Sequence, residues 1–133
     1  MTNKSKRVLS EISPGELLDK ISILEIKLEK VKDKDRQKRI KNEHDILKKV
    51  QNSSIKMSDK IKDLYRSVSN VNIKLWDIED KLRICEKNKD FGKNFIELAR
   101  AVYFNNAKRS KIKSDINKIC GSNIREVKQY VTY

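Results

Sequence analysis

The stretch that decides the fold is SIKMSDKIKDLYRSVSNVNIKLWDIEDKLRICEK, residues 54–87. Apolar side chains recur along it at alternating steps of four and three residues, namely Met57, Ile61, Leu64, Val68, Val71, Leu75, Ile78, Leu82 and Cys85. A 3.5-residue repeat over about four heptads keeps one apolar seam on one side of a helix, facing partner helices. The pattern predicts a long central helix, and its seam is expected to pair within the chain, with a second copy, or with both.

Helices are also predicted on both sides of this stretch. SPGE at 13–16 is a capping box with proline in the first turn, and the apolar steps behind it predict a helix that ends near Lys32. The basic run that follows fits either a hairpin turn or a solvated continuation, before a second helix that carries Leu47 on its apolar face. QNSS at 51–54 is interpreted as a linker, with Ser53 or Ser54 capping the central helix.

The last helical region is expected to begin after a break at 88–92, with Asp90 as its cap. Apolar steps weaken near Asn105 and resume until Gly121, which fits a C-terminal cap. Three glycines and one proline are too few for a hairpin-rich β fold. We therefore expect an all-α antiparallel helical bundle or coiled-coil hairpin, a single domain over residues 1–133. Residues 1–12 are expected to form a flexible arm and residues 122–133 a tail.

The chain is strongly basic, with a formal net charge of +13 and a pI near 9.8. Clustered cations bind phosphates by releasing counterions, so nucleic-acid binding is one hypothesis, centred on the basic stretch 100–128. However, 24 lysines outnumber 8 arginines, and arginine is the better bidentate partner for phosphate. The lysine-rich composition also fits a general compositional bias, so nucleic acid is the less favoured partner.

No catalytic set or metal site is evident. Cys85 and Cys120 lie on apolar stripes, and the single histidine, His44, has no cysteine or histidine at ligand spacing. We expect no metal, no cofactor and no catalysis; an all-helical mutase of the chorismate type would need several cations converging on one cavity. No apolar stretch approaches the ~18 residues of a membrane span, and the N-terminus lacks a signal core, which favours the cytoplasm.

A second, polar stripe runs beside the apolar seam of the central helix, again at steps of four and three: Asn72, Trp76, Glu79, Arg83 and Glu86. Glu79 and Arg83 are spaced for an ion pair. If the following helix folds back antiparallel, it brings Arg100 and Tyr103 near this edge. The candidate ligand-binding residues are Trp76, Glu79, Arg83, Arg100, Tyr103 and Arg109. The alternative interpretation of the same cluster is a sealed ion-pair network.

Long motifs carry a family resemblance: SPGELLDKISILEIK at 13–27, LWDIEDKLR at 75–83, FIELARAVYFNNAKRSKIKSDIN at 95–117 and GSNIREVKQYVTY at 121–133. They resemble an uncharacterised bacterial family, a domain of unknown function. The family is found alone or appended to glycosyltransferase and tetratricopeptide proteins of surface-polysaccharide gene neighbourhoods. The residues that match its pattern are Asp19, Lys20, Glu25, Trp76, Glu79, Asp80, Arg83, Arg100, Tyr103, Arg109, Lys128 and Tyr130. The resemblance implies a context and no established activity.

Three functions are expected in order. The first is a non-catalytic accessory module that binds a protein partner, a glycosyltransferase or a copy of itself, because the seam is long and no catalytic set is present. The second is binding of an anionic ligand, such as a sugar-nucleotide or a phosphorylated head group, at the Trp/Arg/Tyr cluster. The third is nucleic-acid binding by the basic stretch.

Overall fold

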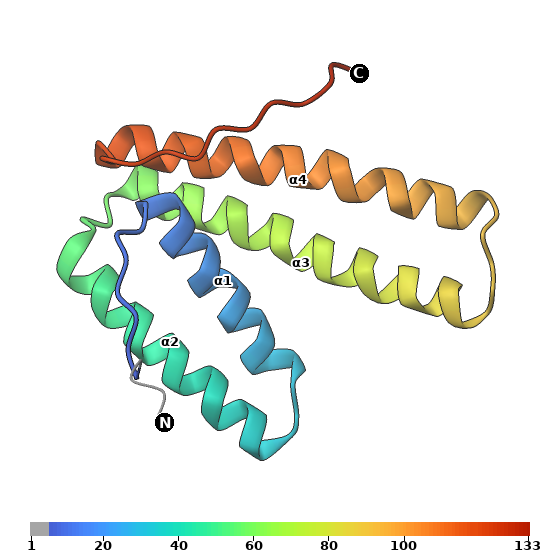
Figure 1. Cartoon of the computed structure of the whole chain (residues 1–133), viewed down its shortest axis with the longest axis horizontal. Coiled ribbons are helices and arrows are strands. Elements are labelled where there is room, and N and C mark those ends of the chain that lie inside the picture. Colours follow the sequence, from blue (N-terminus) through green and yellow to red (C-terminus); the bar gives the residue numbers. More distant parts are fainter. Residues whose placement is uncertain (1–5) are drawn as a thin grey trace, which may run out of the picture.

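The computed structural model describes residues 6–133, so the first five residues of the expected flexible arm lie outside the described part. The described residues form four helices and no strand: α1 (Pro14–Lys30), α2 (Lys34–Ser54), α3 (Asp59–Lys87) and α4 (Lys93–Cys120). α3 and α4 run antiparallel as a long hairpin, and α1 packs against both while α2 packs on α1 (Figure 1). The expected all-α bundle is confirmed.

The start of α1 follows from its capping residues. The Ser13 hydroxyl accepts a hydrogen bond from the backbone N–H of Glu16, and Pro14 occupies the first turn, where its missing N–H costs nothing. The helix ends at Lys30, two residues before the expected end. Asp33 then caps α2 by accepting a bond from the N–H of Arg36 at 3.0 Å. The basic run therefore begins a new helix after a short turn.

The predicted linker at 51–54 is wrong, because these residues form the last turn of α2. Ser58 caps α3 in place of Ser53 or Ser54, with its hydroxyl accepting from the N–H of Ile61. Gln51, expected in the linker, is buried. The sequence offers serines at both positions, and the helix start is decided by the packing of α2 on α1.

The break after α3 also differs in detail from the expectation. Gly92, with no side-chain hydrogen bond, precedes α4, and Asp90 instead accepts a bond from the N–H of Gly92 inside the loop. α4 is continuous through Asn105. Gly121 ends it in the left-handed conformation with φ of 64°, as its position predicted.

The core forms where α1, α3 and α4 meet. Leu18, Ile61 and Ile116, one from each helix, are almost fully buried against one another. Every residue of the predicted seam is buried or half-buried, with Val68 fully buried. α1 and α4 thus provide the partner that the seam requires, within a single chain.

The N-terminal end of α1 lies very close to the C-terminal part of α4. The backbone N–H of Gly15 donates to Oδ1 of the buried Asn117 at 2.7 Å. A Cβ at Gly15 would lie 2.5 Å from the carbonyl oxygen of Lys113, nearer than atoms approach without displacement. Glycine is therefore required at this position by helix contact, and the contact fixes α1 against α4 near the candidate site.

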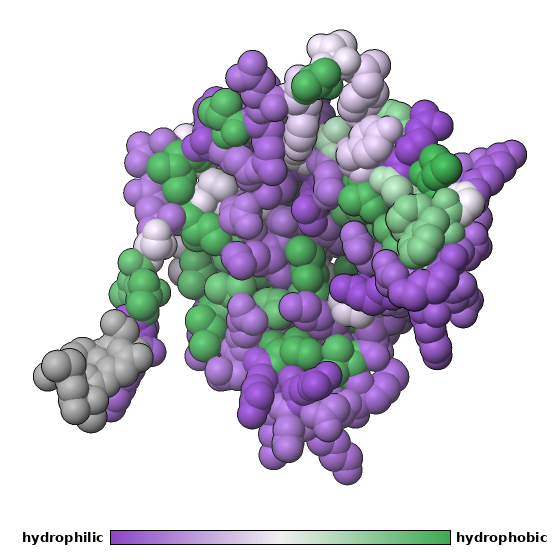
Figure 2. Space-filling view, turned by 45° about the vertical axis from the view of Figure 1, so that its right-hand side comes forward, coloured by the Kyte–Doolittle hydropathy of each residue, from purple (hydrophilic) through white to green (hydrophobic). Residues whose placement is uncertain are grey.

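Hydrophilic side chains cover most of the face drawn in Figure 2, where apolar residues form small, separated areas. Among the exposed apolar residues are Ile84, Phe91 and Ile96 near the α3–α4 loop. None of the helices in the described range 6–133 is both long and apolar enough to cross a membrane.

Candidate functional site

A buried polar network joins α1 to α3 beneath the surface of the bundle. Asn72 donates from Nδ2 to Oδ1 of Asp19 and to Oγ of Ser22, both at 2.8 Å. Ser22 itself donates to the backbone carbonyl of Asp19. All three side chains are less than 5% exposed. Buried polar groups need such partners, because an unpaired one costs about 1–3 kcal/mol.

Arg109 of α4 extends this network toward the surface. Its Nη1 donates to Oδ1 of Asn72 at 3.3 Å. Asp19, although part of the same network, faces Asn72 and Lys113, and no carboxylate in residues 6–133 lies within 4.0 Å of the Arg109 guanidinium. A guanidinium presents five N–H donors in a planar fork suited to carboxylate or phosphate. Most of these donors are left for an external anion.

Lys113, one turn further along α4, is by contrast fully paired. Its Nζ lies 2.7 Å from Glu16 and 3.2 Å from Glu126, and 3.9 Å from Asp19. Burial alone would lower the pKa of Lys113, but the hydrogen bonds to Glu16 and Glu126 outweigh it, so the pKa lies above its ordinary value. This lysine holds α1, α4 and the C-terminal segment together.

A groove lies on one side of Arg109, between α1, α3 and α4. It has a volume of about 360 Å³, within the range of small-molecule sites. Its lining residues are Ile23, Ile26, Asn72, Leu75, Trp76, Glu79, Asp80, Arg83, Asn106 and Arg109. We call it the Trp76 groove. It combines an aromatic ring and aliphatic side chains with two carboxylates and two guanidinium groups.

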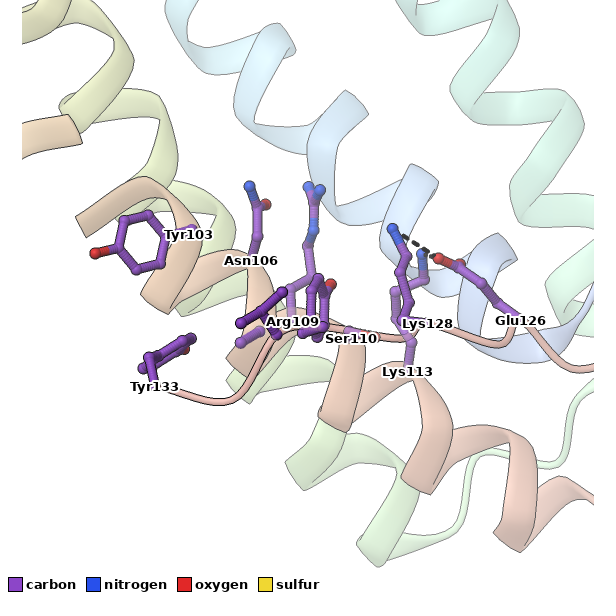
Figure 3. Close-up of a pocket in the computed structure, with 11 residues that line it drawn as sticks. Tyr103, Asn106, Arg109, Ser110, Lys113, Glu126, Lys128 and Tyr133 are labelled. Carbon is purple, nitrogen blue, oxygen red and sulfur yellow. Dashed lines mark hydrogen bonds and ion pairs between the residues drawn. The ribbon is translucent and has the colours of Figure 1, made fainter. Parts of the chain in front are cut away.

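A second hollow of about 420 Å³ lies on the other side of Arg109. Its roof is the C-terminal segment 122–133, here called the strap, which runs back along α4 (Figure 1). Its lining residues are Tyr103, Asn106, Ala107, Arg109, Ser110, Lys113, Glu126, Lys128, Tyr130, Val131 and Tyr133. In Figure 3, Arg109 and Asn106 extend side by side between the tyrosines and the lysine–glutamate group. We call this the strap hollow.

Charge pairing and aromatic contacts hold the strap in place. Glu126 accepts from Lys113 at 3.2 Å and from Lys128 at 3.0 Å. The hydrogen bond from Lys128, together with that from Lys113, outweighs partial burial and keeps the pKa of Glu126 below its ordinary value. At the far end, the Tyr133 ring meets Tyr103 and Phe104 edge-on, with centroids 5.6 and 5.0 Å apart.

The family of unknown function DUF6165 matches residues 8–133, nearly the whole chain. The chain belongs to this family. No curated protein and no solved structure matches it. For this DUF6165 chain, the resemblance to an uncharacterised domain is confirmed, and the argument about activity depends on the geometry of the two hollows.

Of the six candidate residues, the Trp76 groove brings together Trp76, Glu79, Arg83 and Arg109. Tyr103 lines the strap hollow instead. Arg100, expected near the Trp76 edge, lines neither hollow; its guanidinium carbon lies 5.8 Å from the centre of the Phe104 ring. The helix hairpin is antiparallel as expected, but the rotation of α4 turns Arg109 and Asn106, one to three turns later, toward the groove.

The expected ion pair between Glu79 and Arg83 is not formed within 4.0 Å in the described chain; both groups face the groove as separate polar contacts. The sequence analysis also did not identify Asn106 or the strap as part of a site. The tail motif contained Lys128 and Tyr130, but a sequence pattern gives no indication that residues 128 and 130 fold back over residue 109.

His44, the one histidine, has a structural position in the DUF6165 bundle. Its Nε2 lies 3.3 Å from Glu25, which also accepts a hydrogen bond from the Tyr65 hydroxyl. Burial and this bond to Glu25 raise the pKa of Tyr65 above its ordinary value. The trio connects α2, α1 and α3. Among residues 6–133, no cluster of three or more potential metal ligands occurs.

Proposed function

We propose that the chain is a non-catalytic helical module that binds a small, hydroxyl-bearing anion, of the sugar-phosphate class, in the Trp76 groove. The observation that carries the proposal is Arg109. It is half-buried, held by a hydrogen bond to Asn72, and placed between two hollows without a carboxylate partner in the described residues. A positioned guanidinium of this kind pays little ordering entropy when an anion binds.

The rest of the groove favours a ligand with hydroxyl groups over a bare anion. Glu79 and Asp80 supply carboxylate oxygens that accept hydrogen bonds from hydroxyls, and Trp76 offers an apolar face to a sugar ring. Arg83 and Arg109 balance the two carboxylates, so the groove as a whole is neutral. A neutral groove attracts a polyanion weakly, which favours one phosphate at Arg109 over a nucleic-acid backbone.

The test uses the single Trp as a reporter. Glucose 1-phosphate, glucose and inorganic phosphate are titrated into the chain, with Trp76 fluorescence and melting temperature recorded. Binding to the folded state alone raises stability by about 2.7 kcal/mol at 100 times Kd. We expect glucose 1-phosphate to change both signals at concentrations where glucose and phosphate do not. Unchanged signals with all three compounds would refute the proposal.

The expectation of a protein partner remains a prediction, but its first argument is weaker. That argument was an apolar seam in need of cover, and α1 and α4 cover it within the chain. The nucleic-acid hypothesis also remains a prediction. Several cations of its basic stretch are already paired with carboxylates, among them Lys111 with Asp115 and Lys113 with Glu16.

The expected biological setting is part of the same proposal. A sugar-phosphate ligand agrees with a bacterial, cytoplasmic protein associated with glycosyltransferases of surface-polysaccharide synthesis. In that setting the module delivers or senses an activated sugar and does not transform it.

A further inference from the structure

We infer that the strap hollow binds a nucleobase, so that the full ligand is a nucleoside diphosphate sugar spanning both hollows. The inference rests on the proposed function and extends it from the sugar-phosphate half to the whole molecule. It starts from a spatial relationship. The Trp76 groove and the strap hollow share two lining residues, Asn106 and Arg109. A diphosphate at Arg109 therefore has one hollow on each side.

The two hollows differ in chemistry, and the difference matches the two ends of such a ligand. The Trp76 groove contains the carboxylates of Glu79 and Asp80 for sugar hydroxyls. The strap hollow has three tyrosines, Tyr103, Tyr130 and Tyr133, with the amide of Asn106 and the hydroxyl of Ser110. Aromatic rings stack on bases of any sequence, and amide and hydroxyl groups bond to base edges.

The charges of the strap hollow direct the phosphates to Arg109. Lys113 and Lys128 already share the Glu126 carboxylate, at 3.2 and 3.0 Å. Arg109 has no such partner in the described residues and lies where the two hollows meet. With three cations against one carboxylate, the hollow still carries net positive charge. It therefore favours an anionic ligand over a neutral nucleoside.

The strap tyrosines are available for such a contact. Tyr130 is 53% exposed and Tyr133 is 71% exposed in the free chain, so a stacked base would bury aromatic surface that is now in water. The strap contributes no residue to the core of Leu18, Ile61 and Ile116. Removal of its end is therefore expected to leave the four helices folded.

The experiment compares ligands with and without a base in two chains. Glucose 1-phosphate, UDP-glucose and ADP-glucose are titrated into the full chain and into a chain that ends at Lys128, which keeps Glu126 and its two lysine partners. Trp76 fluorescence reports binding, and circular dichroism checks the fold. Val127→Ala, a change of an 89% exposed strap residue that lines neither hollow, is the control for Tyr130→Ala.

In the full chain, at least one nucleotide-sugar should bind about tenfold or more tightly than glucose 1-phosphate, as expected for one stacked base. The shortened chain and Tyr130→Ala should lose most of this advantage while their affinity for glucose 1-phosphate and the affinities of Val127→Ala stay unchanged. Equal affinity of the full chain for all three ligands would overturn the inference and leave the proposed function standing. Binding of none of them would overturn both, and an advantage that survives removal of the strap end would place the base elsewhere and overturn the inference.

Discussion

Arg109 on α4 donates a hydrogen bond to Asn72 on α3, and this bond joins the interior of the bundle to its candidate ligand site. Asn72 is 4% exposed and uses its amide NH₂ to hold Asp19 and Ser22 on α1. Its carbonyl oxygen is thereby turned toward Arg109 at 3.3 Å. One amide thus connects three helices and orients a guanidinium. Stability and ligand binding are therefore expected to depend on the same residue.

Replacing Asn72 by alanine should lower the free energy of unfolding by about 2–3 kcal/mol, because Asp19 and Ser22 lose their donor while staying buried. Urea denaturation measures the change. Asn70→Ala, on the exposed side of the same helix, is the matched control and should change stability by less than about 0.5 kcal/mol. Equal effects of the two substitutions would show that the network contributes nothing specific.

Gly15→Ala should destabilise the bundle by about 1–3 kcal/mol, since the new methyl group meets the Lys113 carbonyl oxygen at 2.5 Å and forces α1 away from α4. Gly92→Ala is a suitable comparison, because its Cβ would meet only the Asp90 side chain, at 3.4 Å. Thermal melts of both variants test this. A Gly15→Ala variant as stable as Gly92→Ala would mean that the helices are not in this close contact.

The strap should loosen in acid. Glu126 has a pKa below its ordinary value of 4.5, so it stabilises the folded chain above that value and stops doing so as the pH falls through its lower folded pKa. Because the pair is largely exposed, the effect is expected to stay below about 1 kcal/mol. Glu126→Gln should therefore melt slightly below the wild type at pH 6, and the difference should vanish near pH 3.

A melting-temperature difference between wild type and Glu126→Gln that is independent of pH would contradict this assignment. Glu97→Gln provides the control. Glu97 is exposed on α4, and no ion pair involving it occurs within 4.0 Å in the part of the chain that the structure describes. Its replacement should leave the acid branch of the melting curve as in the wild type.

The fold was largely predictable because its strongest determinants are local. The SPGE cap and the repeat from Met57 to Cys85 predicted α1 and α3, and every seam residue is at least half-buried. The errors occur where two local solutions compete. Ser53, Ser54 and Ser58 are all good caps, and only the packing of α2 on α1, a contact between distant residues, selects Ser58.

The candidate site was predictable only in part, because it depends on how α4 is rotated and where the strap lies. The stripe on α3 placed Trp76, Glu79 and Arg83 on one edge, and they do line one groove. A helical pattern does not determine whether Arg100 or Arg109 faces that edge. The strap has no periodicity at all, and its position follows from single contacts of Glu126 and Tyr133 with α4.

The central claim is that Arg109 binds the anion, and a pair of charge-matched variants tests it directly. Arg109→Leu and Arg100→Leu remove the same charge from the same helix, but only Arg109 lines the hollows. The measurement is the rise in melting temperature caused by saturating glucose 1-phosphate, relative to each variant without ligand. The account predicts a rise of several degrees in the wild type and in Arg100→Leu, and none in Arg109→Leu. An equal rise in all three proteins would contradict it.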